Sequence, residues 1–362
     1  MKILLVVVGA RPNFMKVARF REVAAIRGDF GIEVVHTGQQ SDDRMTTVFL
    51  DQFQIEPDHW LGIGPGDPHE QIAHIMLGLG PVIKQVAPVG MVVVGDVTST
   101  LAAALTANKM GIPLIHLESG LRSGDLRMPE EVNRILTDRI TDHFLITEPS
   151  AREHLLNEGT PPERIHFVGN TMIDTLVAFQ DRIATDPILA TQGWEGGHAL
   201  ITMHRPAAVD DPVAANRTVD MIEAVAKRHR SIFPIHPRTR SRLQANGLLD
   251  RLSSIPNLHL ASPLDYFAFQ RVLATSTFVV TDSGGVQEET TYRGIPCLTL
   301  RPNTERPITL EIGTNELVPF DVASLNAAMT RIMDGSFKKG RCPELWDGHA
   351  TERVFEVLSR TL

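Results

Sequence analysis

The feature that most constrains the fold is a regular alternation of short apolar runs with longer helical patterns along the chain. The runs are rich in Val, Ile and Leu, as expected of strands that are buried on both faces. Strands that alternate with helices in this way predict parallel βαβ units and therefore an α/β protein. We predict strands over residues 3–8, 32–36, 91–94, 114–116 and 144–146, and then over residues 199–203, 231–235, 258–261, 278–281 and 297–300.

A chain of 362 residues is longer than one hydrophobic core usually supports, so we predict two domains. Each series of strands predicts one doubly wound, Rossmann-like domain. We place the first domain at residues 1–182 and the second at residues 183–350, with a linker candidate at 186–197. Residues 351–362 are predicted to form a C-terminal helix. Because such sheets bind ligands beyond the carboxyl ends of their strands, we expect a ligand in the cleft between the domains.

Charge and composition exclude several classes of protein. The formal net charge of −8 argues against a nucleic-acid partner, since such proteins usually carry a basic field. No apolar run of about 18 residues occurs, so neither a signal peptide nor a membrane partner is expected. Cys297 and Cys342 lack the spacing of a metal site and are expected to be thiols in a reducing compartment. We therefore expect a cytoplasmic protein without a structural metal.

The turn after the first predicted strand is a candidate anion site. Residues 9–13 open a helix, where free N–H groups and the helix dipole favour an anion. Arg11 and Lys16 would supply positive charge to a phosphate. The segment lacks the spacing of glycines that nicotinamide cofactors require, so we expect no such cofactor. The alternative is a turn whose arginine is only solvated.

Three carboxylates of the first domain follow predicted strands or begin helices. They are Asp96, Glu118 and Glu130. Carboxylates that share one cleft can be driven to different pKa values, which allows one to act as a base and another as an acid. Taken alone, Asp96 is equally well explained as a helix cap, and Glu130 is only weak evidence because acidic residues in a first helical turn often complement the helix dipole. Glu118, at a strand end and followed by glycine, is well placed to project into a cleft. No serine nucleophile elbow, P-loop or HExxH motif occurs, which disfavours nucleophilic or metal-assisted hydrolysis.

The second domain offers groups for a nucleotide. His204 ends an apolar run, where it would transfer protons, hold a diphosphate or merely cap a turn. Residues 283–285, Ser-Gly-Gly, lie between a strand and a helix, so their amides are placed to bind a diphosphate. A carboxylate one to two turns later would bind ribose hydroxyls, and Arg306 adds a cation. Tyr266 and Phe267 would form the wall of a base pocket or belong to the core.

Eight segments of the sequence, taken together with their order and spacing, carry a resemblance to a known family. They are GARPNFMK at 9–16, HTGQQSDDRM at 36–45, VVVGDVTSTL at 92–101, HLESGLRSGDLRMPEEVNRILTD at 116–138, VGNTMIDTL at 168–176, HRP at 204–206, TDSGGVQEE at 281–289 and NTERP at 303–307. Together they resemble the non-hydrolysing, bacterial type of the UDP-N-acetylglucosamine 2-epimerase family, over nearly the whole chain.

The resemblance implies a GT-B-like pair of Rossmann domains, a homodimer, and a C-terminal helix that packs back onto the first domain. It implies no cofactor. Asp96, Glu118, Glu130 and His204 match the family's catalytic positions, and Arg134 matches the arginine after its acidic pair. The positions that match UDP-binding residues are Arg11, Lys16, Ser283, Gly284, Gly285, Glu289 and Arg306, with Phe267 at the wall of the uracil pocket.

The implied reaction is the reversible epimerisation of UDP-N-acetylglucosamine at C2, by anti elimination of UDP to a glycal and re-addition. The chain departs from the family at Gln40 and at residues 206–208, near positions associated with an activating second substrate molecule, so that activation is implied less strongly here. Three alternatives stay open. They are a hydrolysing epimerase that releases N-acetylmannosamine and UDP, a GT-B glycosyltransferase, and an inactive sensor of UDP-sugars.

Overall fold

The computed structural model describes residues 1–39 and 43–362, with side chains described for 1–39 and 47–362. The chain forms two compact units, residues 1–178 with 344–362, and residues 179–343. The first boundary thus lies at 178/179, where we had placed it at 182/183.

The segment 186–197, expected to be a linker, belongs to the second unit. It contains helix α10 (Ile188–Gln192), whose C-cap is the left-handed Gly193. Leu189 and Trp194 are buried in a core cluster of this unit. The linker prediction was therefore wrong, because the glycine that suggested a flexible connection ends a helix whose apolar side chains are packed.

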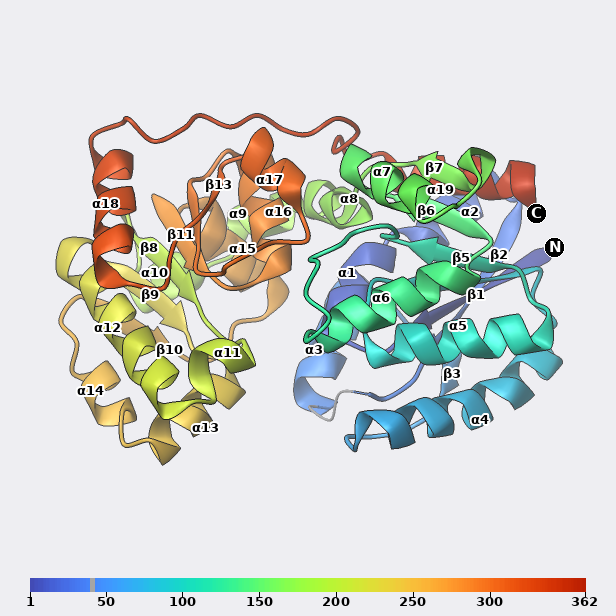
Figure 1. Ribbon diagram of the computed structural model, residues 1–362, viewed down its shortest axis with the longest axis horizontal. Helices are drawn as coiled ribbons and strands as arrows, with labels where there is room; N and C mark the ends of the chain where they lie inside the picture. The colour runs from blue at the N-terminus through green and yellow to red at the C-terminus, as the bar shows by residue number, and fades with distance from the viewer. Residues whose placement is uncertain (40–42) are drawn as a thin grey trace. The chain divides into compact units, whose positions relative to one another are not determined.

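A parallel sheet organises the first unit (Figure 1). Its strand order among the described residues is β3-β2-β1-β4-β5-β6-β7. Such an order, built outward in both directions from β1, is that of a doubly wound Rossmann sheet. The strands are β1 (Lys2–Val8), β2 (Phe30–His36), β3 (His59–Trp60), β4 (Gly90–Val94), β5 (Leu114–Leu117), β6 (His143–Ile146) and β7 (Ile165–Phe167).

Helices cover this sheet, and α5 packs between α4 and α6. The helix expected from Pro12 to about Ile26 is two helices, because the chain breaks at Ala18 and Arg19. At the break the Arg19 guanidinium pairs with Glu352 at 3.2 Å. The helices of this unit are α1 (Arg11–Val17), α2 (Phe20–Arg27), α3 (Asp43–Phe53), α4 (Pro68–Val86), α5 (Thr98–Met110), α6 (Pro129–Ile140), α7 (Pro149–Asn157), the 3-10 turn η1 (Pro162–Arg164), α8 (Thr171–Ala178) and α19 (Ala350–Thr361).

The C-terminal segment is anchored in the first unit by three kinds of contact. Phe355 of α19 packs edge-on against Phe20, with ring centroids 5.5 Å apart. The carboxylate of Asp174 accepts the backbone N–H of Ala350 at 3.0 Å and so caps the start of α19. Trp346 is buried, and its indole N–H donates to a backbone carbonyl at 3.0 Å.

The second unit repeats the pattern with a parallel sheet in the order β10-β9-β8-β11-β12-β13. The two sheets confirm the predicted α/β class with two Rossmann-like domains. The strands are β8 (Ala199–Thr202), β9 (Ser231–Pro234), β10 (Leu258–Ala261), β11 (Phe278–Thr281), β12 (Cys297–Thr299) and β13 (Asn315–Leu317). The helices are α9 (Gln180–Thr185), α10, α11 (Pro206–Val209), α12 (Pro212–Arg228), α13 (Pro237–Ala245), α14 (Leu249–Ser253), α15 (Tyr266–Ala274), α16 (Gly284–Arg293), α17 (Pro307–Glu311) and α18 (Val322–Met333).

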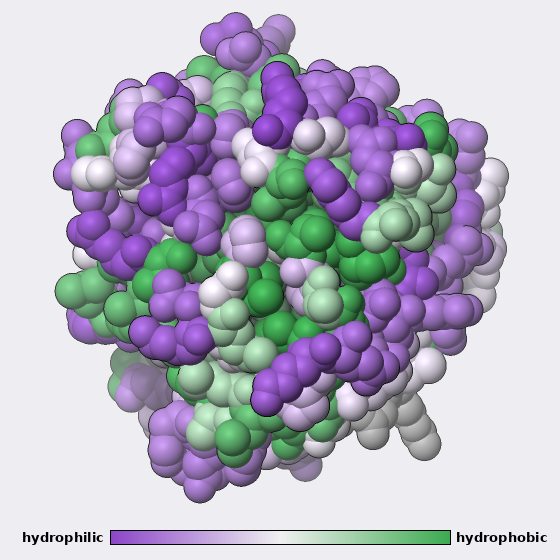
Figure 2. Space-filling view, turned by 90° about the vertical axis from the view of Figure 1, so that its right-hand side faces the viewer, coloured by the Kyte–Doolittle hydropathy of each residue, from purple (hydrophilic) through white to green (hydrophobic). Residues whose placement is uncertain are grey.

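None of the helices in the described part of the chain has the length and apolar character needed to cross a bilayer. The face of the molecule shown in Figure 2 nevertheless carries a central patch of hydrophobic residues, bordered by hydrophilic ones.

Candidate functional site

The carboxyl ends of β1, β4 and β5 meet at one edge of the first sheet. Val94 pairs with Leu117 in parallel register, so the residues that follow them, Gly95 and Glu118, leave the sheet side by side. On its other side β4 pairs with β1, which leads into α1. This register explains why residues far apart in the sequence, predicted separately from their positions after strands, lie in one cluster.

Glu118 and Lys16 form a buried ion pair at this edge. Lys16 Nζ lies 2.5 Å from Glu118 Oε2, and the two side chains are only 8% and 4% exposed. Glu118 has a φ of +68°, a left-handed conformation that costs a non-glycine residue about 1–3 kcal/mol unless its surroundings fix it. Its N–H donates to the carbonyl of Leu145 at 3.0 Å. The cation predicted for a phosphate thus contacts a predicted catalytic carboxylate.

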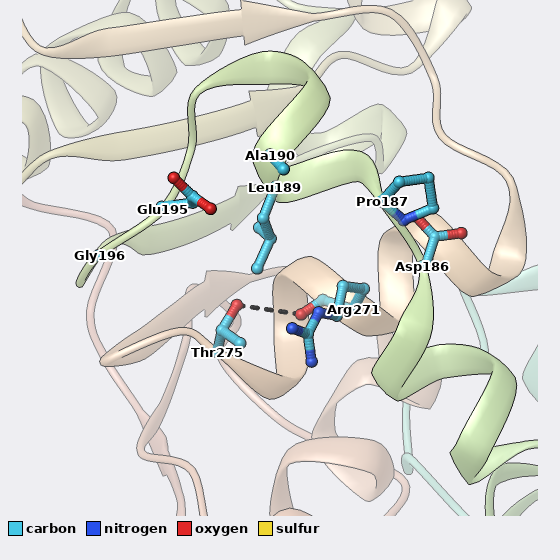
Figure 3. Close-up of a pocket in the computed structure, with 8 residues that line it drawn as sticks. All are labelled: Asp186, Pro187, Leu189, Ala190, Glu195, Gly196, Arg271 and Thr275. Atoms are coloured by element: carbon cyan, nitrogen blue, oxygen red, sulfur yellow. Dashed lines mark hydrogen bonds between the residues drawn. The ribbon is translucent and has the colours of Figure 1, made fainter.

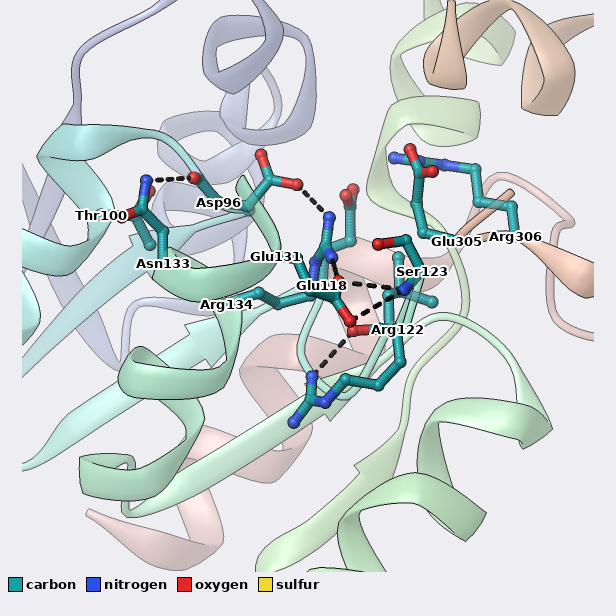
Figure 4. Close-up of polar contacts among 12 residues, drawn as sticks. Asp96, Thr100, Glu118, Arg122, Ser123, Glu131, Asn133, Arg134, Glu305 and Arg306 are labelled. Atoms are coloured by element: carbon teal, nitrogen blue, oxygen red, sulfur yellow. Dashed lines mark hydrogen bonds and ion pairs between the residues drawn. The ribbon is translucent and has the colours of Figure 1, made fainter. Parts of the chain in front are cut away.

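A second set of contacts centres on the buried guanidinium of Arg134, as Figure 4 shows. Arg134 pairs with both Asp96 and Glu131. Asn133, its neighbour on α6, donates to the backbone carbonyl of Asp96 at 2.9 Å. The Asp96 side chain remains 23% exposed, so α6 holds the carboxylate without burying it.

The two adjacent glutamates of α6 have different surroundings. Glu131 is 1% exposed, and its carboxylate accepts the backbone N–H groups of Ser123 and Gly124 at 3.0 Å. Glu130 is exposed on the first turn of the helix. Of the pair, Glu131 fixes the loop before α6, and Glu130 is the one that solvent or a ligand can reach.

The turn after β1 differs from the expectation. Asn13 Oδ1 accepts the N–H groups of Gly9 at 3.0 Å and Ala10 at 3.1 Å, while its amide donates to Val94 O at 3.1 Å. Those two amides are therefore already hydrogen-bonded, and the prediction of free N–H groups was wrong for them. Arg11 lies with its guanidinium over the ring of Phe49, 5.2 Å from the centroid.

In the second unit, His204 is held by Asp282. His204 Nδ1 lies 3.0 Å from Asp282 Oδ1, and the other carboxylate oxygen accepts the N–H groups of His204 and Arg205 at 2.8 Å. Burial would raise the pKa of Asp282, but the charge of His204 and these hydrogen bonds lower it below its usual value. The ring of His204 remains 39% exposed, so it is both oriented and accessible.

The Ser-Gly-Gly turn begins α16, as predicted. Ser283 is the N-cap, and its side chain does not cap the helix. A Cβ atom at Gly284 would lie 2.6 Å from Arg306 Nη1 and 2.8 Å from Glu305 Oε1. Glycine is therefore required at 284 for packing against buried charges, and Gly285 continues the first helical turn.

Arg306 belongs to a buried charge network that the sequence analysis largely missed. It pairs with Glu288 at 2.9 Å and with Glu305 at 2.6 Å. Glu305 also pairs with Arg301 at 2.8 Å and approaches Arg205 at 3.8 Å. Burial would raise the pKa of Glu305, but the charges of Arg306 and Arg301 hold it far below its usual value. Alternating charges in the loop at 301–306 were the signal that could have revealed this network.

The remaining predicted ligand residues of this unit are buried. Glu289 is 4% exposed. Burial of the Tyr266 hydroxyl raises the pKa of Tyr266 most, and the negative charge of Glu289 raises it further. Phe267 is also 4% exposed, and the guanidinium of Arg182 lies 4.1 Å from its ring centroid.

Other features lie apart from the predicted residues. Gln40 is outside the described residues, and residues 206–208 form most of α11. Among the described residues no group of three or more His, Cys, Asp or Glu side chains is arranged to hold a metal. Figure 3 shows a pocket of about 380 Å³ in the second unit, lined by Arg271, Asp186 and Glu195 among others, which contains none of the predicted site residues.

The chain is similar to known proteins over nearly its whole length. The family model of UDP-N-acetylglucosamine 2-epimerase matches residues 24–359. The chain is 33% identical over 363 residues to a protein of that name from Methanocaldococcus jannaschii, with 98% of each chain covered. It is 35% identical over 368 residues to the UDP-2,3-diacetamido-2,3-dideoxy-D-glucuronate 2-epimerase of Pseudomonas aeruginosa, with 99% of each covered. The crystal structure of the M. jannaschii UDP-GlcNAc 2-epimerase in complex with UDP-GlcNAc and UDP matches with a TM-score of 0.91 at 31% identity, over 99% of this chain and 100% of that chain.

Proposed function

Because the chain belongs to the UDP-N-acetylglucosamine 2-epimerase family, we propose that it is a reversible, non-hydrolysing epimerase that converts UDP-N-acetylglucosamine into UDP-N-acetylmannosamine. The observation that carries the proposal is the cluster at the edge of the first sheet, where Asp96 and Glu118 are each held by a buried cation. Relatives named for this activity are similar over nearly their whole length.

The chemistry requires more than proton transfer. The C2 hydrogen of the sugar is not adjacent to a carbonyl, so direct deprotonation would face a very high barrier. Anti elimination breaks the C2–H bond and the C1–O bond to UDP, and forms a C1–C2 double bond. Protonation of C2 from the opposite face, with re-addition of UDP at C1, gives the epimer. We assign the base and the acid to the carboxylates of Asp96, Glu118 and Glu130, with His204 as a further proton-transfer group.

The departing UDP gains negative charge, which positive groups and N–H donors would stabilise. We assign this role to the amides of residues 283–285 and to Arg306, Arg11 and Lys16. The support for it is that Ser283 leaves the start of α16 without a side-chain cap. Glu289 is assigned to the ribose and Phe267 to the uracil pocket, by their match to the family motif, and Arg134 to the orientation of Asp96.

The test is incubation with UDP-N-acetylglucosamine in deuterated water, followed by NMR of the C1 and C2 protons. Elimination and re-addition predict UDP-N-acetylmannosamine with deuterium at C2. Unlabelled epimer would refute elimination, and free N-acetylmannosamine with UDP would establish the hydrolysing alternative. Since a relative named for a diacetamido glucuronate is 35% identical, the same assay should include that UDP-sugar.

We also propose a homodimer in the cytoplasm. Exposed apolar side chains on two helices of the first unit support a dimer, since Leu77 of α4 is 74% exposed and Leu136 of α6 is 47% exposed. Sedimentation velocity would test it, and a monomer at assay concentrations would refute it. Burial raises the pKa of the Cys297 thiol to about 11, which fits an unreactive thiol in a reducing compartment.

A further inference from the structure

A histidine outside the predicted site connects the two loops that carry Asp96 and Glu118. His116 of β5 is fully buried. Its Nδ1 lies 2.7 Å from Asp138 Oδ1, and its Nε2 lies 2.8 Å from the carbonyl oxygen of Gly95. A carbonyl oxygen only accepts hydrogen bonds, and so does an ionised carboxylate. Both ring nitrogens are therefore placed as donors, Nδ1 to the carboxylate of Asp138 and Nε2 to the carbonyl of Gly95.

Asp138 on α6 is arranged as the ionised partner. Its Oδ2 accepts the N–H of Gly120 at 3.1 Å and pairs with Arg122 Nη1 at 2.7 Å. Burial would raise the pKa of Asp138, but the charges of His116 and Arg122 and their hydrogen bonds lower it. Arg122 pairs in turn with Glu158 at 2.8 Å. The carboxylate of Asp138 thus lies between His116 and Arg122, and Arg122 lies between Asp138 and the carboxylate of Glu158, which is 25% exposed.

Gly95 and Gly120, which are hydrogen-bonded to His116 and Asp138, lie beside the two proposed catalytic carboxylates. Gly95 immediately precedes Asp96, and Gly120 follows Glu118 by two residues. Gly95 and Gly120 have φ values of +63° and +78°, and Glu118 has a φ of +68°. A Cβ atom at Gly120 would lie 2.6 Å from the carbonyl oxygen of Ala151. Glycine adopts left-handed backbone freely, whereas Glu118 keeps it only where neighbouring groups fix it. His116 and Asp138 supply such contacts, because they bond the backbone of Gly95 and Gly120 from inside the sheet.

We propose that His116 and Asp138 are positioning residues, which set the separation of the Asp96 and Glu118 carboxylates without touching the substrate. This inference rests on the proposed function. Removing a proton from one face of C2 and returning one to the other requires accurate placement of the groups that transfer protons, Asp96 and Glu118 among them. Misplacement by about 1 Å can cost about 100-fold in rate. Loss of the pair should therefore lower kcat and leave UDP binding intact.

Two substitutions test the role in turnover. Asn at 116 is too short to reach both Gly95 and Asp138, so His116→Asn should lower kcat about 10- to 100-fold, with KM and the Kd for UDP within about twofold of the original. Asp138→Asn can keep both hydrogen bonds of this side chain if its amide N–H donates to His116 Nδ1 and its oxygen accepts the N–H of Gly120. It should therefore retain more activity than Asp138→Ala, a rescue that general destabilisation would not give.

The matched control is Asp142→Ala. The Asp142 carboxylate accepts the N–H of Leu114 at 2.9 Å, at the opposite end of β5 from Glu118. Its substitution by Ala should therefore leave kcat unchanged. The proposal is overturned if His116→Asn keeps the original kcat, or if its kcat and its UDP affinity fall together.

Two readouts do not depend on turnover. In protein labelled with 15N-histidine, the His116 signal, identified by its loss in His116→Asn, should show a proton on each ring nitrogen at the assay pH. Hydrogen exchange followed by mass spectrometry should be faster in His116→Asn for peptides covering 95–96 and 118–122, and unchanged in the second unit. A bare ring nitrogen, or unchanged exchange, would overturn the positioning role. Absence of turnover by the original protein would instead refute the proposed function, while these readouts stand.

Discussion

Replacing Glu118 with Gln removes one charge from a buried ion pair and preserves the size of the side chain. The side chains of Lys16 and Glu118 are 8% and 4% exposed, and their charged atoms are 2.5 Å apart. Removing one partner of a buried pair leaves the other charge uncompensated, which costs about 3–5 kcal/mol. In urea denaturation followed by circular dichroism, we expect the free energy of unfolding to fall by about this amount. The turnover number should fall by about two decades or more, the range of acid–base catalysis.

The double variant Lys16→Met/Glu118→Gln separates the two effects. Replacing both partners of a buried pair with uncharged side chains of similar size is often neutral, so most of the lost stability should return. The turnover number should stay low, because the carboxylate is still absent. The coupling free energy from the double-mutant cycle measures the ion pair itself. A cycle without coupling would refute the buried pair, and turnover at the original rate in Glu118→Gln would remove Glu118 from the mechanism.

Three further predictions follow from the surroundings of single residues. Glu130→Gln should lower turnover by about two decades and leave the free energy of unfolding within about 0.5 kcal/mol, because Glu130 is exposed; a stability loss in urea denaturation would contradict this. The pKa of Asp282 is lowered, so its contribution to stability is present above its unfolded pKa of about 3.9 and is lost as the pH falls through its lower folded value. Asp282→Asn should flatten the decline in unfolding free energy below about pH 4, and an unchanged slope would show that the lowered pKa does not contribute. Gly284→Ala places a methyl group 2.6 Å from Arg306 Nη1 and should cost about 1–3 kcal/mol of stability while weakening UDP binding in calorimetry; binding at the original affinity would separate this turn from the ligand.

The strands were predictable where apolar runs of four or more residues are buried, as in β1 and β4. Three short strands were missed, namely β3, β7 and β13. β7 buries only Ile165, and its extended form depends on pairing with β6 rather than on its own pattern. The break between α1 and α2 was also missed, because the apolar period continues across it. Arg19 at the break contacts Glu352, 333 residues away, and no local pattern contains that information.

The sequence predicts a residue of the candidate site correctly where the residue's position directly after a strand is enough to place it there. Parallel strands end at one edge, so Asp96 and Glu118 were brought together by register alone. Which side chains they pair with was not predictable, because Lys16 comes from α1 and Arg134 from α6. Asn13 shows the same limit in another form. A turn that exposes N–H groups to an anion exposes them equally to the side-chain oxygen of a nearby asparagine. Only the fold decides which acceptor binds them.

The α6 helix shows how one element divides equivalent residues between two tasks. Glu131, Arg134 and Asp138 are spaced by three and four residues, so they share one face of the helix, and all three are buried. That face carries contacts to Asp96, to the loop before the helix and to His116. Glu130, one residue before the first of them, is turned about 100° away and is exposed. Substitutions on the buried face should therefore change stability and the placement of the carboxylates together, whereas substitution of Glu130 should change only the chemistry.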